Sequence, residues 1–409
     1  MDDLIFLQSL PLDLLYIVTN YDPAVLFIYP KKELIEFNWT RLLKFNFHKD
    51  YKDSSISSDQ LMRIYIHNYW GINKIICGRE EAFIINDNAT VMNFDMGQRV
   101  FFEKMSFLSE SRPCDIKDFE KNILQIAYGG AHIIVLLIDG TLLCRGSNYS
   151  GQLGLGHLRA RDKFHKNDTL EGMGKDMSIR QIACGNNHTL ILLTNGTLWG
   201  CGDNRNGQLG FESLEDIKSL TKIDDVKNIV QIACGFYHSF IKLDDGTIMG
   251  CGNNSSGQLG LGEVQVVRSF TKIEYVSKNI SEIVCGNCTT FLLMDDGTSM
   301  SCGFGLSGTL GHGDNLNRDT FSPIKNLSNI VKMQAGYDHV ICSLSNGTIM
   351  SCGSFYSNEF HPSNQNIFTE IKNLPGKVEN IGTGPFAEYV IIRLTDGTLI
   401  RYGDFTFKN

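Results

Sequence analysis

Residues 181–210 read QIACGNNHTLILLTNGTLWGCGDNRNGQLG, and related copies of this stretch recur along the chain. Its central Asn-Gly-Thr step returns at nearly constant spacing, always with Asp or Asn before the glycine. A second glycine ends an apolar run before each step. A third glycine follows six residues after the glycine of the intact Gly-Thr steps. The intact steps begin at Gly140, Gly196, Gly246, Gly297, Gly347 and Gly397, and a worn copy lies at Ala89-Thr90. The chain therefore contains seven repeats of about fifty residues.

Each repeat is expected to contain a β-hairpin. The Asp-Gly and Asn-Gly pairs lie between apolar runs such as residues 189–193 and 197–199. These dipeptides tolerate the positive φ angles of tight hairpin turns. A short run rich in Ile, Ala and Cys precedes the hairpin, and a glycine-rich loop and a further strand follow it. The pattern thus predicts four short strands in every repeat.

A sheet of four short strands cannot bury both of its faces alone. Arranging such sheets around an axis packs every face against a neighbour and leaves few free edges. The sequence therefore predicts an all-β fold, a seven-bladed β-propeller. An open solenoid would need polar capping repeats, whereas the outermost repeats here are degenerate copies.

The repeat also resembles that of the regulator of chromosome condensation (RCC1) family. One copy reads Ile-x-Cys-Gly-x-x-His at 232–238, Asp-Gly-Thr at 245–247 and Cys-Gly-x-Asn-x-x-Gly-Gln-Leu-Gly at 251–260. The resemblance covers residues 74–409 and implies an RCC1-like propeller there. In that family strands from the two chain ends pair to close the ring. The resemblance therefore implies that residues 61–69, within a linker at 51–73, complete the blade left open by residues 398–402.

Composition narrows the classes of function. The net charge of −8 and the absence of a basic N-terminal tail make chromatin a less favoured partner. No apolar run approaches the roughly 20 residues of a membrane span, and the acidic start is unlike a secretion signal. Most of the 12 cysteines occupy recurring repeat positions. We expect them to be buried, reduced thiols, which predicts an intracellular protein, cytoplasmic or nuclear.

Residues 1–50 have a different pattern, which predicts three short helices. Part of it resembles the F-box, whose family role is to dock a target-binding protein onto a cullin ubiquitin ligase through the adaptor Skp1. The alternative is that these helices only pad the propeller. The residues that carry the resemblance are Leu10, Pro11, Leu14, Leu15, Pro23, Leu26 and Trp39.

No catalytic, cofactor or metal site is predicted. Residues 303–308 spell a dinucleotide-binding fingerprint, but they occupy the loop position of a repeat rather than a strand-to-helix turn. Cys285 and Cys288 are close in sequence without a second pair at zinc spacing. Four histidines share one repeat position, which favours structural groups that bond the backbone: His132, His188, His238 and His339.

Two loop regions are candidates for partner binding. One interval between repeats is longer than the rest, and its extra residues fall within 157–180. This segment is rich in basic side chains and is expected to project from the ring as an insertion. The glycine-rich loops at 203–206 and 253–256 are expected to form a rim. The predicted contact residues are Arg159, Arg161, Lys163, Lys166, Asp203, Asn204, Arg205, Asn253 and Asn254.

Three functions are consistent with these features. The repeats favour a non-catalytic scaffold that binds a protein partner. The RCC1 resemblance implies guanine-nucleotide exchange on a Ran-like small GTPase, which needs no covalent chemistry. The F-box resemblance implies a substrate adaptor for a cullin ubiquitin ligase, with Skp1 as its partner.

Overall fold

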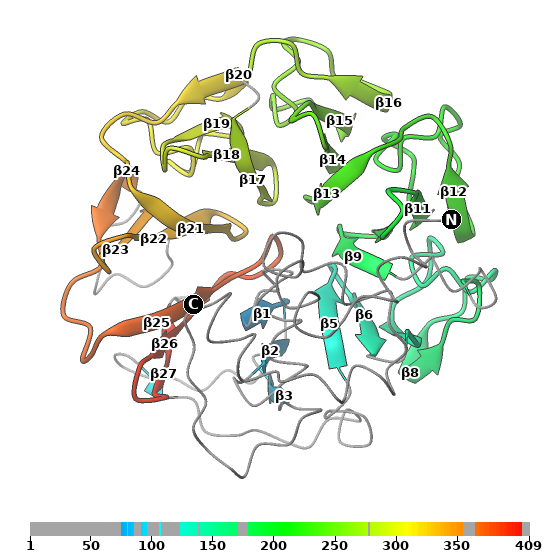
Figure 1. Ribbon diagram of the computed structural model, residues 1–409, viewed down its shortest axis with the longest axis horizontal. Helices are drawn as coiled ribbons and strands as arrows, with labels where there is room; N and C mark the ends of the chain where they lie inside the picture. Colours follow the sequence, from blue (N-terminus) through cyan, green and yellow to red (C-terminus); the bar gives the residue numbers. More distant parts are fainter. Residues whose placement is uncertain are drawn as a thin grey trace, which may run out of the picture.

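The computed structural model describes residues 75–79, 81–85, 91–95, 106–107, 123–137, 140–170, 179–276, 279–354 and 365–402. Every regular secondary-structure element within these residues is a β-strand. The strands form six four-stranded antiparallel sheets and one three-stranded sheet, arranged around a common axis (Figure 1). This part of the chain is an all-β propeller.

The strands have the following bounds. The three-stranded sheet contains β1 (Ile75–Cys77), β2 (Glu81–Ile85) and β3 (Val91–Asp95). Three blades follow: β5 (Ile123–Tyr128), β6 (His132–Leu137), β7 (Leu142–Gly146) and β8 (Arg161–Lys166); β9 (Ile179–Cys184), β10 (His188–Leu193), β11 (Leu198–Gly202) and β12 (Ile217–Ile223); β13 (Ile229–Cys234), β14 (His238–Leu243), β15 (Ile248–Asn253) and β16 (Val266–Lys272). The last three are β17 (Ile280–Cys285), β18 (Thr289–Met294), β19 (Ser299–Gly303) and β20 (Arg318–Pro323); β21 (Ile330–Ala335), β22 (His339–Leu344), β23 (Ile349–Gly353) and β24 (Gln365–Glu370); β25 (Val378–Gly382), β26 (Val390–Leu394), β27 (Leu399–Tyr402) and β4 (Ser106–Phe107).

The predicted number of blades needs a correction. Six complete four-stranded blades are present among the described residues, not seven. The remaining sector holds the sheet β1–β3, whose first strand packs against both β25 and β5. The most degenerate repeat thus contributes three described strands. The helices predicted for residues 1–50 fall outside the described residues.

The last blade is completed by a strand from the other half of the chain. Arg401 of β27 pairs with Ser106 of β4, and Ile400 pairs with Phe107. The family resemblance predicts residues 61–69 at this edge. The structure has β4 there instead, and 61–69 lie outside the described residues.

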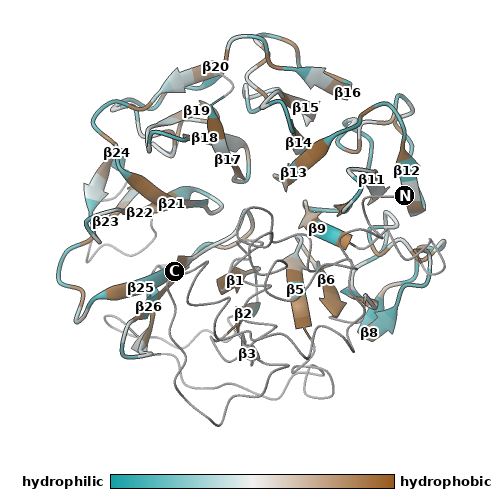
Figure 2. Cartoon of the chain, in the orientation of Figure 1, coloured by the Kyte–Doolittle hydropathy of each residue, from teal (hydrophilic) through white to brown (hydrophobic). Residues whose placement is uncertain are grey.

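The apolar core lies between the blades. Strands near the axis, such as β5 and β13, are strongly apolar, whereas the peripheral strand β8 is hydrophilic (Figure 2). Leu190 and Leu192 of one blade pack with Ile232 of the next in a single buried cluster. Another cluster joins Ile75 of the three-stranded sheet to Ile391 of the last blade. Each sheet therefore depends on its neighbours for burial of its faces.

A repeated hydrogen-bond relay, here called the blade staple, also joins neighbouring blades. In one copy, His132 Nε2 lies 2.9 Å from the Thr189 hydroxyl oxygen of the next blade. That hydroxyl donates to the main-chain carbonyl of Gln152, back in the first blade, at 2.8 Å. Equivalent staples join His188 to Ser239 and His238 to Thr290, and those hydroxyls donate to Gln208 and Gln258.

The staple determines which ring nitrogen of the histidine is protonated. Because the Thr189 hydroxyl spends its one hydrogen on the Gln152 carbonyl, His132 must donate from Nε2. His132 Nδ1 is then unprotonated, and it is buried without a hydrogen-bond partner. Burial lowers the pKa of His132 to about 3. His132, His188 and His238 are neutral structural groups, and each bonds a hydroxyl of the next blade rather than the backbone. His339 bonds the Thr383 hydroxyl of the next blade and also the main chain of Tyr389.

Buried thiols share the same carbonyl groups. Cys201 donates to the Gln152 carbonyl at 3.5 Å, and Cys251 donates to the Gln208 carbonyl at 3.4 Å. Burial raises the pKa of both thiols. All 11 cysteines of the described residues are free thiols, and only Cys288 is not fully buried.

The glycine three residues before each histidine makes room for the imidazole ring. A Cβ atom at Gly185 would lie 1.9 Å from His188 Cε1, and one at Gly129 would lie 2.1 Å from His132 Cε1. Neither glycine has a positive φ angle. The requirement is therefore steric, and the Cys-Gly-x-x-His motif acts as one packing unit.

One of the seams between four-stranded blades lacks the histidine–hydroxyl bond. Between blades β17–β20 and β21–β24, Thr289 stands in the histidine position and Val340 in the hydroxyl position. The Thr289 hydroxyl is buried without a hydrogen-bond partner. Phe291, Met333 and Val340 belong to one buried cluster, so apolar packing holds this seam.

The substitution Gly185→Ala should destabilise the protein by roughly 3 kcal/mol, because the new methyl group would overlap the His188 ring. Urea denaturation followed by circular dichroism measures the change. In a His188→Ala background the same substitution should be far less damaging, because the overlapping ring is gone. An equal loss in both backgrounds would contradict the packing unit.

Stability should decrease as the pH falls from neutrality. Burial lowers the pKa of His132, His188, His238 and His339 to about 3, whereas an unfolded chain keeps histidine near about 6.5. Between these values the unfolded state binds more protons, so the free energy of unfolding decreases by up to ~1.4 kcal/mol per histidine and pH unit.

Urea denaturation at a series of pH values between about 7 and 4.5 measures this slope. The variant His188→Gln should have a shallower slope, by close to one proton, although it is less stable at neutral pH. A slope that is the same in the variant and the parent protein would show that His188 does not contribute.

Candidate functional site

In five of the blades, two described loops meet on the same side of the ring. The Asp203 N–H donates to the Asn187 carbonyl at 2.7 Å, which ties the loop after the third strand to the loop after the inner strand. We call this side the loop face. Its described residues are 78–79, 129–131, 147–160, 185–187, 203–216, 235–237, 253–265, 286–288, 304–317, 336–338 and 384–388.

A buried asparagine organises three of the longer loops, at Asn148, Asn204 and Asn254. Asn204 Oδ1 accepts from the Leu209 N–H at 2.9 Å, while its Nδ2 donates to the carbonyls of Phe211 and Ser213. Asn254 makes the same set of bonds in the next blade. Both asparagines are 3 % exposed or less. The prediction that Asn204 and Asn254 contact a partner is therefore corrected, since their amides are used inside the loops.

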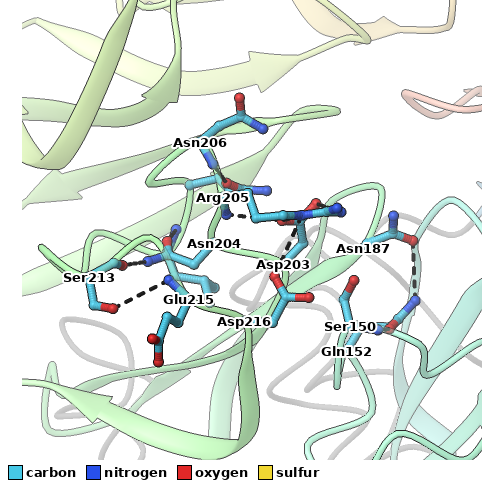
Figure 3. Close-up of polar contacts among 12 residues, drawn as sticks. Ser150, Gln152, Asn187, Asp203, Asn204, Arg205, Asn206, Ser213, Glu215 and Asp216 are labelled. Atoms are coloured by element: carbon cyan, nitrogen blue, oxygen red, sulfur yellow. Dashed lines mark hydrogen bonds and ion pairs between the residues drawn. The ribbon is translucent and has the colours of Figure 1, made fainter.

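Arg205 lies at the tip of its loop and is held in one orientation. Its Nε and Nη2 donate to the two carboxylate oxygens of Asp203 at 2.9 and 3.0 Å, and Asp216 lies 3.7 Å away (Figure 3). Asp203 is buried, while the Arg205 side chain is 65 % exposed. The loop thus presents a fixed guanidinium group to solvent.

The two carboxyl groups beside Arg205 respond differently to it. Burial by itself would raise the pKa of Asp203, but the hydrogen bonds and charge of Arg205 hold that pKa below its ordinary value. Burial and the charge of Asp203 raise the pKa of Asp216. Two carboxyl groups share one guanidinium group here, so the loop has an excess of negative charge.

The loop tips differ from blade to blade. The position of Arg205 is occupied by Tyr149, Ser255 and Leu306 in three other blades. Tyr149 is 77 % exposed and Leu306 is 59 % exposed. Asn253, also predicted as a contact, accepts from Ser255 and from Gln258 Nε2 inside its own loop. The exposed tips, rather than the asparagines, are available to a partner.

The basic part of residues 157–180, expected to project from the ring, is mostly a strand. Arg161, Lys163 and Lys166 belong to β8, an ordinary outer strand that pairs with β7. Arg161 Nη2 lies 2.9 Å from His157 Nε2, and Lys166 pairs with Asp168 at 3.2 Å. The extra residues of this repeat follow β8 instead, because β8 starts at the usual offset from Gly140. Of the four basic contacts predicted in this segment, Arg159 alone lies on the loop face, and it is exposed.

Aromatic rings gather at the axial end of the loop face, a feature that sequence reasoning missed. The rings of Phe236 and Phe386 have centroids 5.7 Å apart, and Phe236 meets Tyr237 edge-on at 4.5 Å. Phe236 follows β13 and Phe386 follows β25, so the contact joins two blades that are not neighbours. We call Phe236, Tyr237 and Phe386 the axial aromatic cluster. The equivalent loop positions hold unlike residues in other repeats, such as Gly130, Asn186 and Cys288, so no repeated pattern marks the cluster in the sequence.

The described residues contain no group of three or more His, Cys, Asp or Glu side chains that could hold a metal ion. No helix among them has the length and apolar character needed to cross a membrane. The fold and the loop face together define a repeat propeller that presents exposed loops from one side of a rigid ring.

The comparison with protein families identifies this propeller further. The family model of the RCC1-like domain matches residues 57–327. The chain belongs to this family, as the repeat resemblance predicted.

Individual relatives match shorter segments. The chain is 27 % identical over 185 residues to the human probable E3 ubiquitin-protein ligase HERC6 and 41 % identical over 97 residues to the bovine secretion-regulating guanine nucleotide exchange factor. These matches cover 44 % and 23 % of the chain, but only 18 % and 20 % of the two relatives. An RCC1 repeat-containing protein of Schizosaccharomyces pombe is 29 % identical over 58 % of the chain and 56 % of its own length.

Solved structures support the fold. Yeast RCC1 (Prp20) bound to Kap60 has a TM-score of 0.64 with 17 % identity, over 82 % of this chain and 80 % of the other. Human WBSCR16 has a TM-score of 0.61 with 20 % identity, over 82 % and 88 % of the two chains.

The substitution Asn204→Ala should destabilise the protein by roughly 2 to 4 kcal/mol, because it leaves several loop groups without their partner. Thermal unfolding by differential scanning calorimetry measures the loss. Asn206→Ala is the matched control, since the loop network uses the main-chain N–H of Asn206. Equal effects of the two substitutions would contradict the organising role of Asn204.

Proposed function

We propose that this protein is a non-catalytic interaction scaffold that binds a protein partner on its loop face. The observation that carries the proposal is the contrast within the loops. Buried asparagines and blade staples hold the loops of Tyr149 and Arg205, while these two side chains stand exposed at the tips. Tyrosine and arginine on a rigid support are the residue types that most often dominate binding energy at protein interfaces.

The partner that we propose is a Ran-like small GTPase, on which the protein would act as a guanine-nucleotide exchange factor. Relatives named as a guanine nucleotide exchange factor and as a GTPase regulator support this proposal at the level of the family. Yeast Prp20p, which shares the fold, was described together with its binding to Gsp1p and histones. Exchange requires a surface that distorts the GTPase, so the lack of an acid-base site does not oppose it.

Two structural proposals accompany this function. We infer that the sheet β1–β3 is the seventh blade, because it fills the sector between β25 and β5 and buries Phe83 against Ile123. The exposed Arg159 remains a proposed partner contact on the loop face. Docking to Skp1 through residues 1–50 stays a prediction, since those residues lie outside the described part of the chain.

The proposal predicts that Tyr149→Ala lowers exchange on a Ran-like GTPase by about tenfold in kcat/KM. Release of a fluorescent GDP analogue from the GTPase measures the rate. Tyr275→Ala is the matched control, because Tyr275 is 89 % exposed in the loop after β16, on the opposite side of the blade. This control should change the rate by less than about twofold.

The two parts of the proposal can fail separately. A parent protein that does not accelerate nucleotide release would contradict the exchange activity. Equal losses for Tyr149→Ala and Tyr275→Ala would contradict the loop face as the binding surface.

A further inference from the structure

The axial end of the loop face combines aromatic rings with acidic side chains. The Tyr337 N–H donates to the Ala387 carbonyl at 2.9 Å, which brings two neighbouring loops together beside the axis. Asp338 follows Tyr337, and Glu388 follows Ala387. Both carboxyl side chains are half-buried. On the same loops, Phe386 contacts Phe236 from across the ring.

Main-chain hydrogen bonds hold the loops around this end in place. The Asn186 N–H donates to the Phe236 carbonyl at 3.1 Å, and the Phe236 N–H donates to the Asn287 carbonyl at 3.0 Å. No such bond joins Asn287 to Tyr337 among the described residues. The interruption lies at the seam that also lacks the blade staple. Asp338 thus lies next to a seam that lacks both the blade staple and the main-chain bond between inner loops.

The carboxyl groups of Asp338 and Glu388 are partly removed from solvent. Neither forms an ion pair with a cationic side chain in the described part of the chain. Burial raises the pKa of Asp338. Burial also raises the pKa of Glu388, Asp338 raises it further, and Arg79 on the loop after β1 opposes the shift. These shifts mean that a cation placed between the two groups would relieve an unfavourable charge arrangement.

The charge of the surrounding surface has the same sign. The described loop face carries eight carboxylate side chains and three arginines, with no lysine. Exposed carboxylates such as Glu212 and Glu263 lie away from the axis on other loops. A basic partner would therefore be attracted to the whole face, while a phosphate backbone would be repelled.

From this geometry we propose that the axial aromatic cluster, together with Asp338 and Glu388, binds an arginine or lysine side chain carried by a basic segment of a protein partner. The partly exposed rings of Phe236 and Tyr237 offer their faces to the aliphatic stem and the charge, and the two carboxylates neutralise it. The proposal rests on the loop face as the binding surface proposed above, but it does not require exchange activity.

A labelled peptide tests this site directly. The probe is a fluorescein-labelled peptide of twelve residues that alternates arginine and glycine, and fluorescence anisotropy measures its Kd for the full-length protein. The double variant Asp338→Asn with Glu388→Gln should bind about tenfold more weakly. The matched control, Glu212→Gln with Glu263→Gln, removes the same charge from the same face and should change the Kd by less than about twofold.

Two further measurements separate the site from general attraction. Phe236→Leu keeps every charge and should still weaken binding about threefold through loss of the ring. A peptide with citrulline in place of arginine should lose nearly all affinity. Circular dichroism and the Tm of each variant establish that it is folded, and the conservative single variant Glu388→Gln serves if the double variant is not.

Several outcomes would overturn the proposal. Equal weakening of the axial and control double variants would indicate diffuse attraction without a site. Unchanged binding of the citrulline peptide, or no binding of the arginine peptide at all, would also contradict it. Preferential binding of a single-stranded oligonucleotide would show that the face recognises a different class of molecule. None of these results depends on nucleotide release, so they are distinguishable from failure of the exchange proposal.

Discussion

The blade staple and the glycine that makes room for it are the constraint on which the rest of the ring depends. A hydrogen bond from a histidine to a hydroxyl of the next blade is possible only if the imidazole can lie against the backbone, and Gly185 and its equivalents leave that space. The hydroxyl in turn bonds a main-chain carbonyl within the glycine-rich loop. One contact therefore sets the distance between blades and anchors a loop at the same time.

This coupling explains why the loop face is a suitable platform for binding. The loops that carry the exposed Tyr149 and Arg205 are held to the next blade, because their Gln152 and Gln208 carbonyls accept hydrogen bonds from its hydroxyl groups. A rigid support lowers the entropy lost when a partner binds. At the seam of Thr289 and Val340, apolar packing replaces the polar staple. The proposed axial site borders this seam.

Sequence reasoning performed well where the repeat itself carried the information. The Asn-Gly turn at Gly196 joins β10 to β11 in the expected hairpin register, and its glycine has a φ of 78°. Reasoning from single positions did less well. Asn204 looked like an exposed rim residue because it is polar and lies in a loop, yet it is buried. Its recurrence at Asn148 and Asn254 was the sign of a structural role.

The sequence by itself determined the strands, the turns and the family, because the spacing of glycines and apolar runs is a local property that repetition makes unmistakable. Only the tertiary structure decided which strand completes the last blade, since β4 and β27 are far apart in sequence and their pairing depends on closure of the ring. It also brought Phe236 and Phe386 together across the axis. No local pattern records such a contact, because it arises from the curvature of the whole ring rather than from any one repeat.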